Sequence, residues 1–125
     1  MTKKIYVAGR SITRDGVEGA IEKLTKAGFE VTFDWTKHPR IVFRDEPDKA
    51  REYSLIELAA VDSSDALVLI SDKEGTGMYV EMGYALAKDK PVYVVGKWNT
   101  KPMFMYHPAV IKCGTVEEVI TKLKG

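Results

Sequence analysis

The chain has 125 residues, 45% of them hydrophobic, which suits one domain with a single core over residues 1–125 and leaves no room for a second. Its 19 basic and 18 acidic side chains give a formal charge of +1, so neither nucleic acid polymers nor acidic membranes are expected partners. One cysteine excludes a framework of internal disulfides. No apolar run reaches the roughly 20 residues that cross a bilayer, and no secretory signal precedes the first strand, so we expect a cytoplasmic protein.

Short apolar runs alternate with amphipathic segments along the chain, which is typical of parallel strands connected by helices. A polar segment broken by Pro39 predicts a loop, and Pro47 suits the first turn of the helix after it. In the first half we expect a strand at Lys4–Ala8, a helix at Gly16–Ala27 with Gly28 as its C-terminal cap, a strand at Glu30–Trp35, a loop at Thr36–Glu46 and a helix from Pro47 to about Ser63.

The second half continues the alternation of strands and helices. Thr115 and Glu118 have the spacing of a capping box at the start of the last helix. We expect strands at Asp65–Ser71, Pro91–Gly96 and Val110–Cys113, and helices from Thr76 to Ala87 and from Thr115 to Lys124.

This order of elements predicts an α/β fold with three layers, in which about five strands form a doubly wound parallel sheet of the flavodoxin or Rossmann-like type. The expected strand order is 2-1-3-4-5. Such sheets bind ligands beyond the carboxyl ends of the strands, where the order reverses between strands 1 and 3. The first strand continues there into Gly9 and Arg10, and the third continues through Asp72 to a glycine turn. We therefore expect the site where these two segments meet.

The glycine turn at residues 75–77 runs into a helix whose apolar face is bordered by one carboxylate, Glu81. Gly75 and Gly77 allow the backbone to approach a ligand closely, and the helix start offers free N–H groups. A carboxylate beside an apolar stripe is costly unless it is paired or functional, although a solvated, peripheral glutamate is the alternative interpretation. The apolar stripe consists of Met78, Met82, Ala85 and Leu86.

Five segments of the chain follow the order and spacing of motifs in a known family: KIYVAG at 4–9, SDALV at 64–68, GMYVEMGYA at 77–85, KPV at 90–92 and FMYHP at 104–108. Together they resemble the nucleoside 2-deoxyribosyltransferase superfamily, which includes the deoxynucleoside 5′-monophosphate N-glycosidases. The resemblance covers nearly the whole chain. It implies a retaining double displacement at the anomeric carbon of a 2-deoxyribose, which needs neither a cofactor nor a metal.

The resemblance also implies roles for individual residues. Glu81 would be the nucleophile, and Tyr6 would donate a hydrogen bond that positions it, unless Tyr6 is an ordinary aromatic strand residue. Glu57 stands where the family usually has an aspartate, so it would protonate the leaving base with a longer side chain, or it is a solvated helix residue. Asp72 is a second candidate acid, or a turn residue. Asp65 begins a buried strand and is interpreted as structural.

Other polar and aromatic groups are candidates for substrate binding. Arg10 or Arg14 could bind a 5′-phosphate, or both could be surface residues. Trp35 could stack on a nucleobase, or belong to the core. In this family a neighbouring subunit often completes the site, which gives His107 a possible role. The full set of substrate-binding candidates is Gly9, Arg10, Asp34, Trp35, Gly75, Thr76, Gly77, Met78 and His107.

Three functions remain open at this point. The first is an enzyme whose expected partners are a deoxynucleoside or deoxynucleotide and a free nucleobase. For this enzyme, we place sugar transfer ahead of hydrolysis of a 5′-monophosphate. A nucleotide-binding module without catalysis is the second class, and Glu57 in place of aspartate is its best argument. A phosphoacceptor receiver domain would fit the fold but lacks an acidic cluster at the first strand. We also expect a homodimer or larger assembly, with the exposed segment Trp98–Tyr106 as a contact surface.

Overall fold

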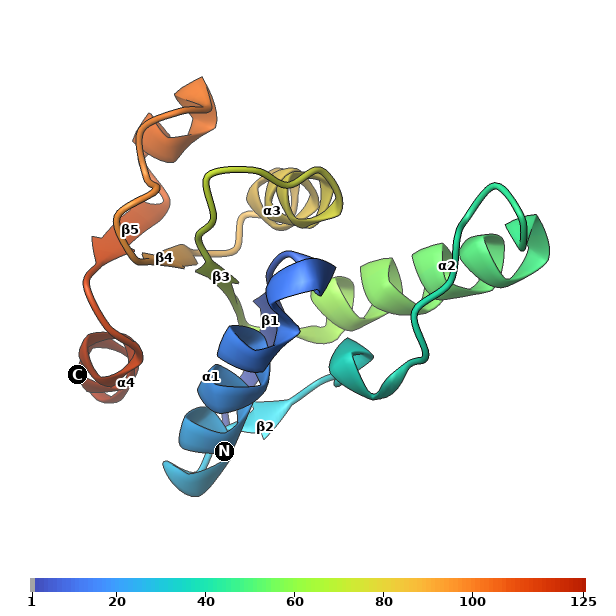
Figure 1. The fold of residues 1–125 in the computed structure, drawn as a ribbon. Coiled ribbons are helices and arrows are strands. Elements are labelled where there is room, and N and C mark those ends of the chain that lie inside the picture. The colour runs from blue at the N-terminus through green and yellow to red at the C-terminus, as the bar shows by residue number, and fades with distance from the viewer. Residues whose placement is uncertain (1) are drawn as a thin grey trace.

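The computed structural model describes residues 2–125 and contains one sheet of five parallel strands. The strand order is β2-β1-β3-β4-β5, so the predicted order and the α/β class are confirmed (Figure 1). The elements are β1 (Lys4–Ala8), η1 (Ser11–Thr13), α1 (Arg14–Lys26), β2 (Glu30–Val31), η2 (Trp35–Lys37), α2 (Pro47–Ser63), β3 (Ala66–Ile70), α3 (Gly77–Ala87), β4 (Val92–Val95), η3 (Met103–Tyr106), β5 (Val110–Cys113) and α4 (Val116–Lys124), where η marks a short 3₁₀-helix.

Helices cover both faces of the sheet and produce the three predicted layers. α1 packs beside α4, whereas α2 packs beside α3 (Figure 1). The central strands β1 and β3 are almost fully buried, and β3 pairs with β1 on one side and with β4 on the other. Side chains alternate between the two faces of a strand. Tyr6 is fully buried on the face of β1 that the α2 and α3 layer covers, and this register places its hydroxyl near both helices.

The second strand is shorter than predicted, because only Glu30–Val31 pairs with β1. The chain then turns into η2, where the indole N–H of Trp35 donates to the carbonyl oxygen of Val7 over 2.8 Å. The carboxylate of Asp34 accepts the backbone N–H of Thr36 over 3.0 Å and so caps this turn. The second half of the predicted strand is therefore wrong. Burial of the indole against β1 draws the chain inward and outweighs the strand propensity of the sequence.

The first helix begins at Arg14, two positions before its predicted start, and η1 precedes it. Its predicted cap is confirmed: Gly28 has φ of 99°, a conformation that glycine adopts without a steric penalty. The N–H of Gly28 donates to the carbonyl oxygen of Thr25 over 3.0 Å, and the N–H of Phe29 donates to that of Leu24 over 3.1 Å. These two bonds satisfy carbonyl groups at the end of the helix.

The predicted capping box of the last helix is half formed. The hydroxyl of Thr115 accepts the N–H of Glu118 over 3.1 Å, as expected. The carboxylate of Glu118 accepts the N–H of Gly114 over 3.0 Å, where a complete box would use the N–H of Thr115. The carboxylate thus reaches one residue further back along the chain.

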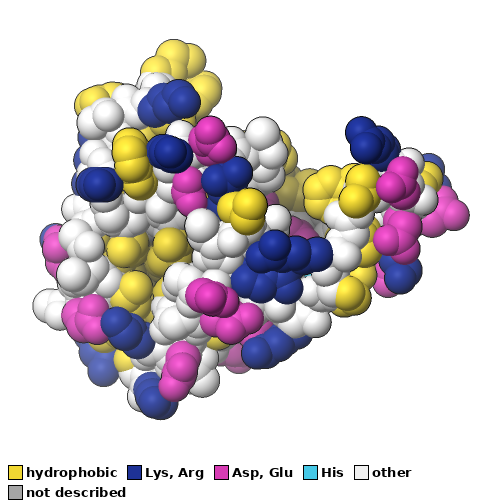
Figure 2. Space-filling view, viewed as in Figure 1, with side chains coloured by type: hydrophobic (Ala, Val, Ile, Leu, Met, Phe, Trp, Pro, Cys, Tyr) yellow, Lys and Arg dark blue, Asp and Glu magenta, His cyan; other side chains and the backbone are white. Residues whose placement is uncertain are grey.

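The loop between η2 and α2, together with the N-terminal half of α2, extends beyond the edge of the sheet (Figure 1). We call this projection the arm, and it comprises residues 38–56. Figure 2 shows a hollow between the arm and the body of the molecule. Within residues 2–125, none of the helices combines the length and apolar character that a membrane span requires.

Candidate active site

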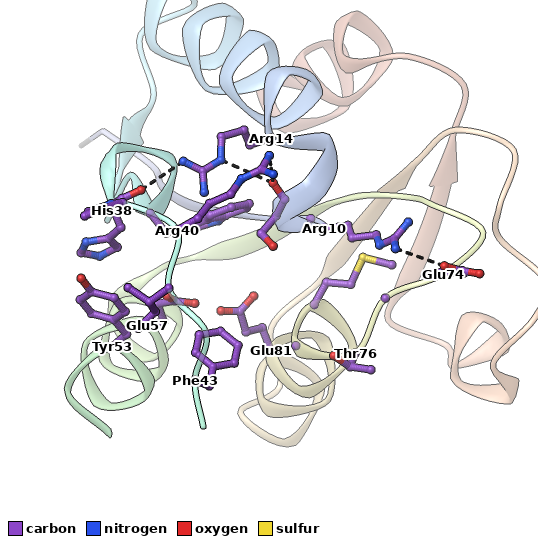
Figure 3. A pocket seen from close by; sticks show the side chains of 18 residues that line it. Arg10, Arg14, His38, Arg40, Phe43, Tyr53, Glu57, Glu74, Thr76 and Glu81 are labelled. Carbon is purple, nitrogen blue, oxygen red and sulfur yellow. Dashed lines mark hydrogen bonds and ion pairs between the residues drawn. The ribbon is translucent and has the colours of Figure 1, made fainter. Parts of the chain in front are cut away.

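A pocket of about 520 Å³ lies beyond the carboxyl ends of β1 and β3, where the strand order reverses. Its volume falls in the range of roughly 300–1,000 Å³ that is typical of small-molecule sites. The turn after β1, the arm, and the glycine turn with the start of α3 surround it (Figure 3). The sequence candidates that line this pocket are Gly9, Arg10, Arg14, Trp35, Glu57, Gly75, Thr76, Gly77, Met78 and Glu81.

Glu81 lies in the second turn of α3 and is only 7% exposed. The hydroxyl of Tyr6 donates to Oε2 of Glu81 over 2.6 Å, and the same hydroxyl lies 3.4 Å from Oε1 of Glu57. Glu57 comes from α2 and lines the pocket with Glu81. Residues from β1, α2 and α3 therefore form one cluster of two carboxyl groups and a phenol. We call Tyr6, Glu57 and Glu81 the carboxyl cluster.

The surroundings of Glu81 and Tyr6 favour the protonated form of each. Burial raises the pKa of Glu81 from its ordinary 4.5 to about 9, and the hydrogen bond and charge of Glu57 act in the same direction. The hydrogen bond from Tyr6 opposes this shift. Burial and the two adjacent carboxyl groups raise the pKa of Tyr6 as well, so its hydroxyl stays protonated and remains a donor.

Two carboxyl groups in this environment can divide acid and base chemistry between them. Because burial and the neighbouring Glu57 raise the pKa of Glu81 to about 9, Glu81 retains its proton at neutral pH until it can pass that proton on. One group can then act as a carboxylate while the other donates a proton. The hydroxyl of Tyr6 stabilises the carboxylate form of Glu81, to which it is the closer donor.

The glycine turn before α3 forms another wall of the pocket through Gly75, Thr76, Gly77 and Met78. Gly75 has φ of 143°, which side chains disfavour. A Cβ atom added there would lie 2.6 Å from Cε of Met78, so a side chain at this position would displace the end of that methionine. The turn thus brings the backbone to the pocket, as the pattern of glycines predicts.

The candidate acid Asp72 lies outside the lining of the pocket. Its carboxylate accepts the hydroxyl of Thr13 and the N–H of Glu74, both over 3.2 Å, and lies 3.7 Å from the guanidinium of Arg10. The N–H of Glu74 holds the pKa of Asp72 below its usual range, and Thr13 and Arg10 act in the same direction. A carboxyl group with a lowered pKa is a poor proton donor, so the geometry supports the turn interpretation.

Two substrate-binding candidates also lie away from the pocket. Asp34 caps η2 with its carboxylate, as described above. The imidazole Nδ1 of His107 accepts the N–H of Ala109 over 3.0 Å in the segment after η3. A role for His107 in the site of a neighbouring subunit stays a prediction, as does the contact surface at 98–106, where Phe104 is 54% exposed.

Trp35 combines both interpretations that the sequence left open. Its indole N–H is fixed to Val7 and the residue is 7% exposed, yet it lines the pocket. Arg10 also lines the pocket, but its guanidinium is paired with Glu74 over 3.1 Å in addition to Asp72. Its charge is therefore largely compensated within the protein.

The sequence reasoning missed the arm, which it treated only as a polar loop and a helix. His38 stacks on Tyr53 with ring centroids 4.1 Å apart, and the ring of Phe33 is tilted against that of His38 with centroids 5.0 Å apart. The apolar run at residues 41–43, in which Val42 and Phe43 are exposed, was the available signal, since loops on a rigid scaffold often carry binding groups. The missed lining residues are Ser11, His38, Pro39, Arg40, Ile41, Phe43, Tyr53 and Glu74.

Comparisons with known proteins agree with the chemistry that the site suggests. A family model described as nucleoside 2-deoxyribosyltransferase matches residues 5–119. The CMP N-glycosidase BcmB of Clostridium botulinum shares the fold with a TM-score of 0.60 and 18% identity, over 98% of both chains. A 2-deoxyribosyltransferase from Bacillus psychrosaccharolyticus shares it with a TM-score of 0.68 and 18% identity, over 94% of this chain and 90% of that chain. No curated protein sequence gives a significant match.

Within residues 2–125, no three His, Cys, Asp or Glu side chains are grouped so that they could hold a metal ion. The carboxyl cluster, the pocket and the strand order agree with the family match, which extends over most of the chain. The protein therefore belongs to the nucleoside 2-deoxyribosyltransferase family, whose enzymes carry out glycosyl transfer or N-glycoside hydrolysis.

Proposed function

We propose that the protein cleaves the N-glycosidic bond of 2′-deoxynucleosides or their 5′-monophosphates through a covalent intermediate on Glu81, and transfers the sugar to another nucleobase. The observation that carries this proposal is the bond of 2.6 Å from the hydroxyl of Tyr6 to the carboxyl group of Glu81, beside Glu57 in the pocket. Two carboxyl groups that flank a sugar are the usual machinery of glycoside cleavage.

In the first half of the reaction, a carboxylate oxygen of Glu81 forms a bond to C1′ while the bond from C1′ to the base nitrogen breaks. Glu81 is free to attack because its proton passes first to Glu57, to which it is hydrogen-bonded. The electron pair of the broken bond stays on the leaving base, and Glu57 donates this proton to the base. A carboxylate is a weak nucleophile, but it suffices when the transition state resembles an oxocarbenium ion. Tyr6 holds one oxygen of Glu81 by its hydrogen bond, so the other oxygen is available for attack.

In the second half, a nitrogen of an incoming base attacks C1′ and the carboxylate of Glu81 departs. Glu57 takes up the proton that the incoming nitrogen loses, which restores the starting state of the carboxyl cluster. Two successive displacements at C1′ give net retention of configuration. The aromatic lining residues Trp35, Phe43 and Tyr53 offer stacking surfaces for the two bases.

Hydrolysis of a 5′-monophosphate is the second candidate, because it shares the first half of the reaction and replaces the incoming base by water. Arg14 and Arg40 line the pocket and form no ion pair with a carboxylate within residues 2–125, which favours a substrate with a negative charge. The likeness of the fold to a CMP N-glycosidase is compatible with this alternative. Transfer and hydrolysis differ in whether water reaches the intermediate before a base does.

The test is incubation of the protein with each 2′-deoxynucleoside and each 5′-monophosphate, with and without a second free base, followed by chromatography of bases and nucleosides. Base exchange that disappears in Glu81→Ala would establish transfer. Release of free base without exchange would establish hydrolysis. Measurable binding without turnover on any substrate would contradict both and leave a nucleotide-binding module without catalysis.

A further inference from the structure

One large apolar side chain in the lining of the pocket is exposed to solvent. Phe43, in the arm, lines the pocket although it is 67% exposed. Figure 3 shows its ring near the carboxyl groups of Glu57 and Glu81, which line the same pocket. Removal of apolar surface from water is favourable, so a ring in this position is stabilised when a bound molecule covers it. Phe43 is therefore placed to act on a ligand.

The root of the arm is fixed to the body of the protein by two arginines that cross each other. Nη1 of Arg14, at the start of α1, donates to the carbonyl oxygens of Thr36 and His38, each over 3.1 Å. Nη2 of Arg40 donates in the opposite direction, to the carbonyl oxygen of Ser11 over 3.0 Å. Figure 3 shows the two side chains running past each other. The chain is thus held where it enters the arm.

The tip of the arm, residues 41–46, has no such anchor. The N–H groups of Asp45 and Glu46 donate to the carbonyl oxygen of Val42 over 2.9 and 3.2 Å, which closes a tight turn. Within residues 2–125, the hydrogen bonds and ion pairs of this tip all have their partners inside the arm. Segments with few contacts to the rest of a protein are those that open and close most easily. Phe43 can therefore approach the carboxyl groups while the root of the arm stays in place.

The chemistry of the carboxyl cluster does not by itself select the acceptor of the sugar. When water replaces the incoming base, its oxygen forms a bond to C1′, and the bond from C1′ to Glu81 breaks with its electron pair on the carboxylate. Glu57 takes up the proton that the water loses, and free 2-deoxyribose departs. A base nitrogen uses the same two groups in the same way. The choice between transfer and hydrolysis therefore depends on which molecule occupies the space beside C1′.

The arm borders the space that the leaving base vacates. In the proposed reaction the base lies beside Glu57, which protonates it and directly follows the arm in α2. An apolar cavity holds water poorly, because it gives water few hydrogen-bond partners. A nucleobase, in contrast, has flat faces on which aromatic rings can pack. The apolar and aromatic side chains that line the pocket are Trp35, Pro39, Ile41, Phe43, Tyr53 and Met78.

We infer that Phe43 covers this space and selects a nucleobase over water as the acceptor of the deoxyribosyl group; this inference rests on the proposed function. With a base bound, the ring packs on the base and the tip of the arm is held in place. Between the departure of one base and the arrival of the next, the ring lies over C1′ and hinders water. Phe43 is thus a specificity-determining residue, and it takes no part in the transfer of protons or electrons.

The first experiment measures the ratio of base exchange to release of free sugar, at one concentration of acceptor base, in the unaltered protein, Phe43→Ser, Phe43→Leu and Val42→Ser. Val42 is a matched control, because it precedes Phe43 in the same turn, is 53% exposed and does not line the pocket. We expect Phe43→Ser to lower the ratio by about tenfold or more, the usual effect of losing the contact of one large apolar side chain. Phe43→Leu retains an apolar cover and should lose less, and Val42→Ser should keep the ratio. Because both products come from one intermediate, a lower amount of folded protein does not change their ratio.

A second measurement separates the exclusion of water from the binding of the incoming base. At saturating concentrations of acceptor base, the ratio in Phe43→Ser should stay below that of the unaltered protein. Added methanol, which is close to water in size, should be trapped more often as methyl 2-deoxyriboside in Phe43→Ser. Full recovery of the ratio at saturation, with no gain in methanol trapping, would mean that Phe43 only binds the base, which overturns the inference.

The same ratio in Phe43→Ser as in Val42→Ser would also overturn the inference. So would cleavage without exchange in the unaltered protein, since the site then does not select against water; hydrolysis, the second candidate function, would stand. If the unaltered protein cleaves none of the substrates, the proposed function fails and the inference fails with it.

Discussion

The hydroxyl of Tyr6 on β1 donates to Oε2 of Glu81 on α3 over 2.6 Å, and it lies 3.4 Å from Oε1 of Glu57 on α2. This phenol connects an almost fully buried strand to the two helices that cover it. A buried carboxyl group normally destabilises a protein unless a partner satisfies it. Here a single residue both satisfies Glu81 and fixes its orientation toward the pocket, so the fold and the proposed chemistry depend on the same contact.

The raised pKa of Glu81 predicts a specific dependence of stability on pH. The unfolded chain releases this proton near the ordinary pKa of 4.5, whereas the folded protein keeps it up to about pH 9. The contribution of Glu81 to stability is therefore complete below about pH 4.5 and is lost as pH rises toward 9. The slope reaches at most about 1.4 kcal/mol per pH unit.

Glu81→Gln tests this prediction, because glutamine is neutral at every pH and can still accept the bond from Tyr6. We expect the free energy of unfolding to fall less steeply in Glu81→Gln than in the unaltered protein between about pH 5 and pH 8. Urea denaturation at several pH values in this range measures both slopes. Identical slopes would mean that Glu81 ionises normally in the folded protein.

Tyr6→Phe keeps the buried ring and removes only the donor to Glu81. Because the bond from Tyr6 lowers the pKa of Glu81, its loss should raise that pKa and move the acidic limb of the pH–rate profile to higher pH. The free energy of unfolding should fall by about 1–3 kcal/mol, since a buried carboxyl group loses a partner. Tyr93→Phe is a control from β4, where the side chain does not line the pocket. A rate loss in Tyr6→Phe with no shift of the limb would argue against a positioning role.

The loss of rate on replacing Glu57 should depend on whether the leaving group needs to be protonated. Glu57→Gln removes the proton donor, and we expect cleavage of natural deoxynucleosides to slow by about 10²- to 10⁴-fold. A 2-deoxyriboside with a nitrophenol leaving group departs without protonation and should be affected far less. Glu52→Gln, on the exposed face of α2, is the matched control. An equal loss for both kinds of leaving group would assign Glu57 a role other than proton donation.

The strand order and the position of the site could be predicted from the sequence, because both follow from the alternation of strands and helices. Parallel connections have one handedness and bring the ends of the first and third strands together. Glu81 could be singled out because its spacing places a charge beside an apolar stripe. The hydrogen bond from Tyr6 was implied by the family resemblance, and its two atoms meet in the structure.

The arm and the contacts of several acids could not be predicted, because they depend on segments that lie far apart in the sequence. Asp72 and Glu57 look alike in sequence, yet Thr13 and Arg10 make Asp72 part of a turn. The crossing of Arg14 and Arg40 joins α1 to a loop that has no regular pattern. Local propensity carries no information on such contacts, and hydrophobic periodicity carries little outside regular elements.

Replacing Gly9 or Gly19 by alanine should have opposite effects on stability. Gly9 lies just after β1, where the chain approaches α1 closely. A Cβ atom at Gly9 would lie 2.4 Å from Cγ2 of Val17, which is fully buried, so α1 would have to move. Gly9→Ala should therefore lower the free energy of unfolding by about 1–3 kcal/mol, as overpacking does. It should also weaken nucleotide binding, because Arg14 moves with α1.

Gly19 lies within α1, and a Cβ atom there has no neighbour within 4 Å. Gly19→Ala should raise the free energy of unfolding by about 0.5–1 kcal/mol, because alanine loses less backbone entropy in a helix than glycine does. Urea denaturation of both variants measures the two effects against the unaltered protein. A loss of stability in Gly9→Ala would agree with the contact with Val17, whereas stabilisation by Gly9→Ala would show that β1 and α1 are less tightly packed than the structure indicates.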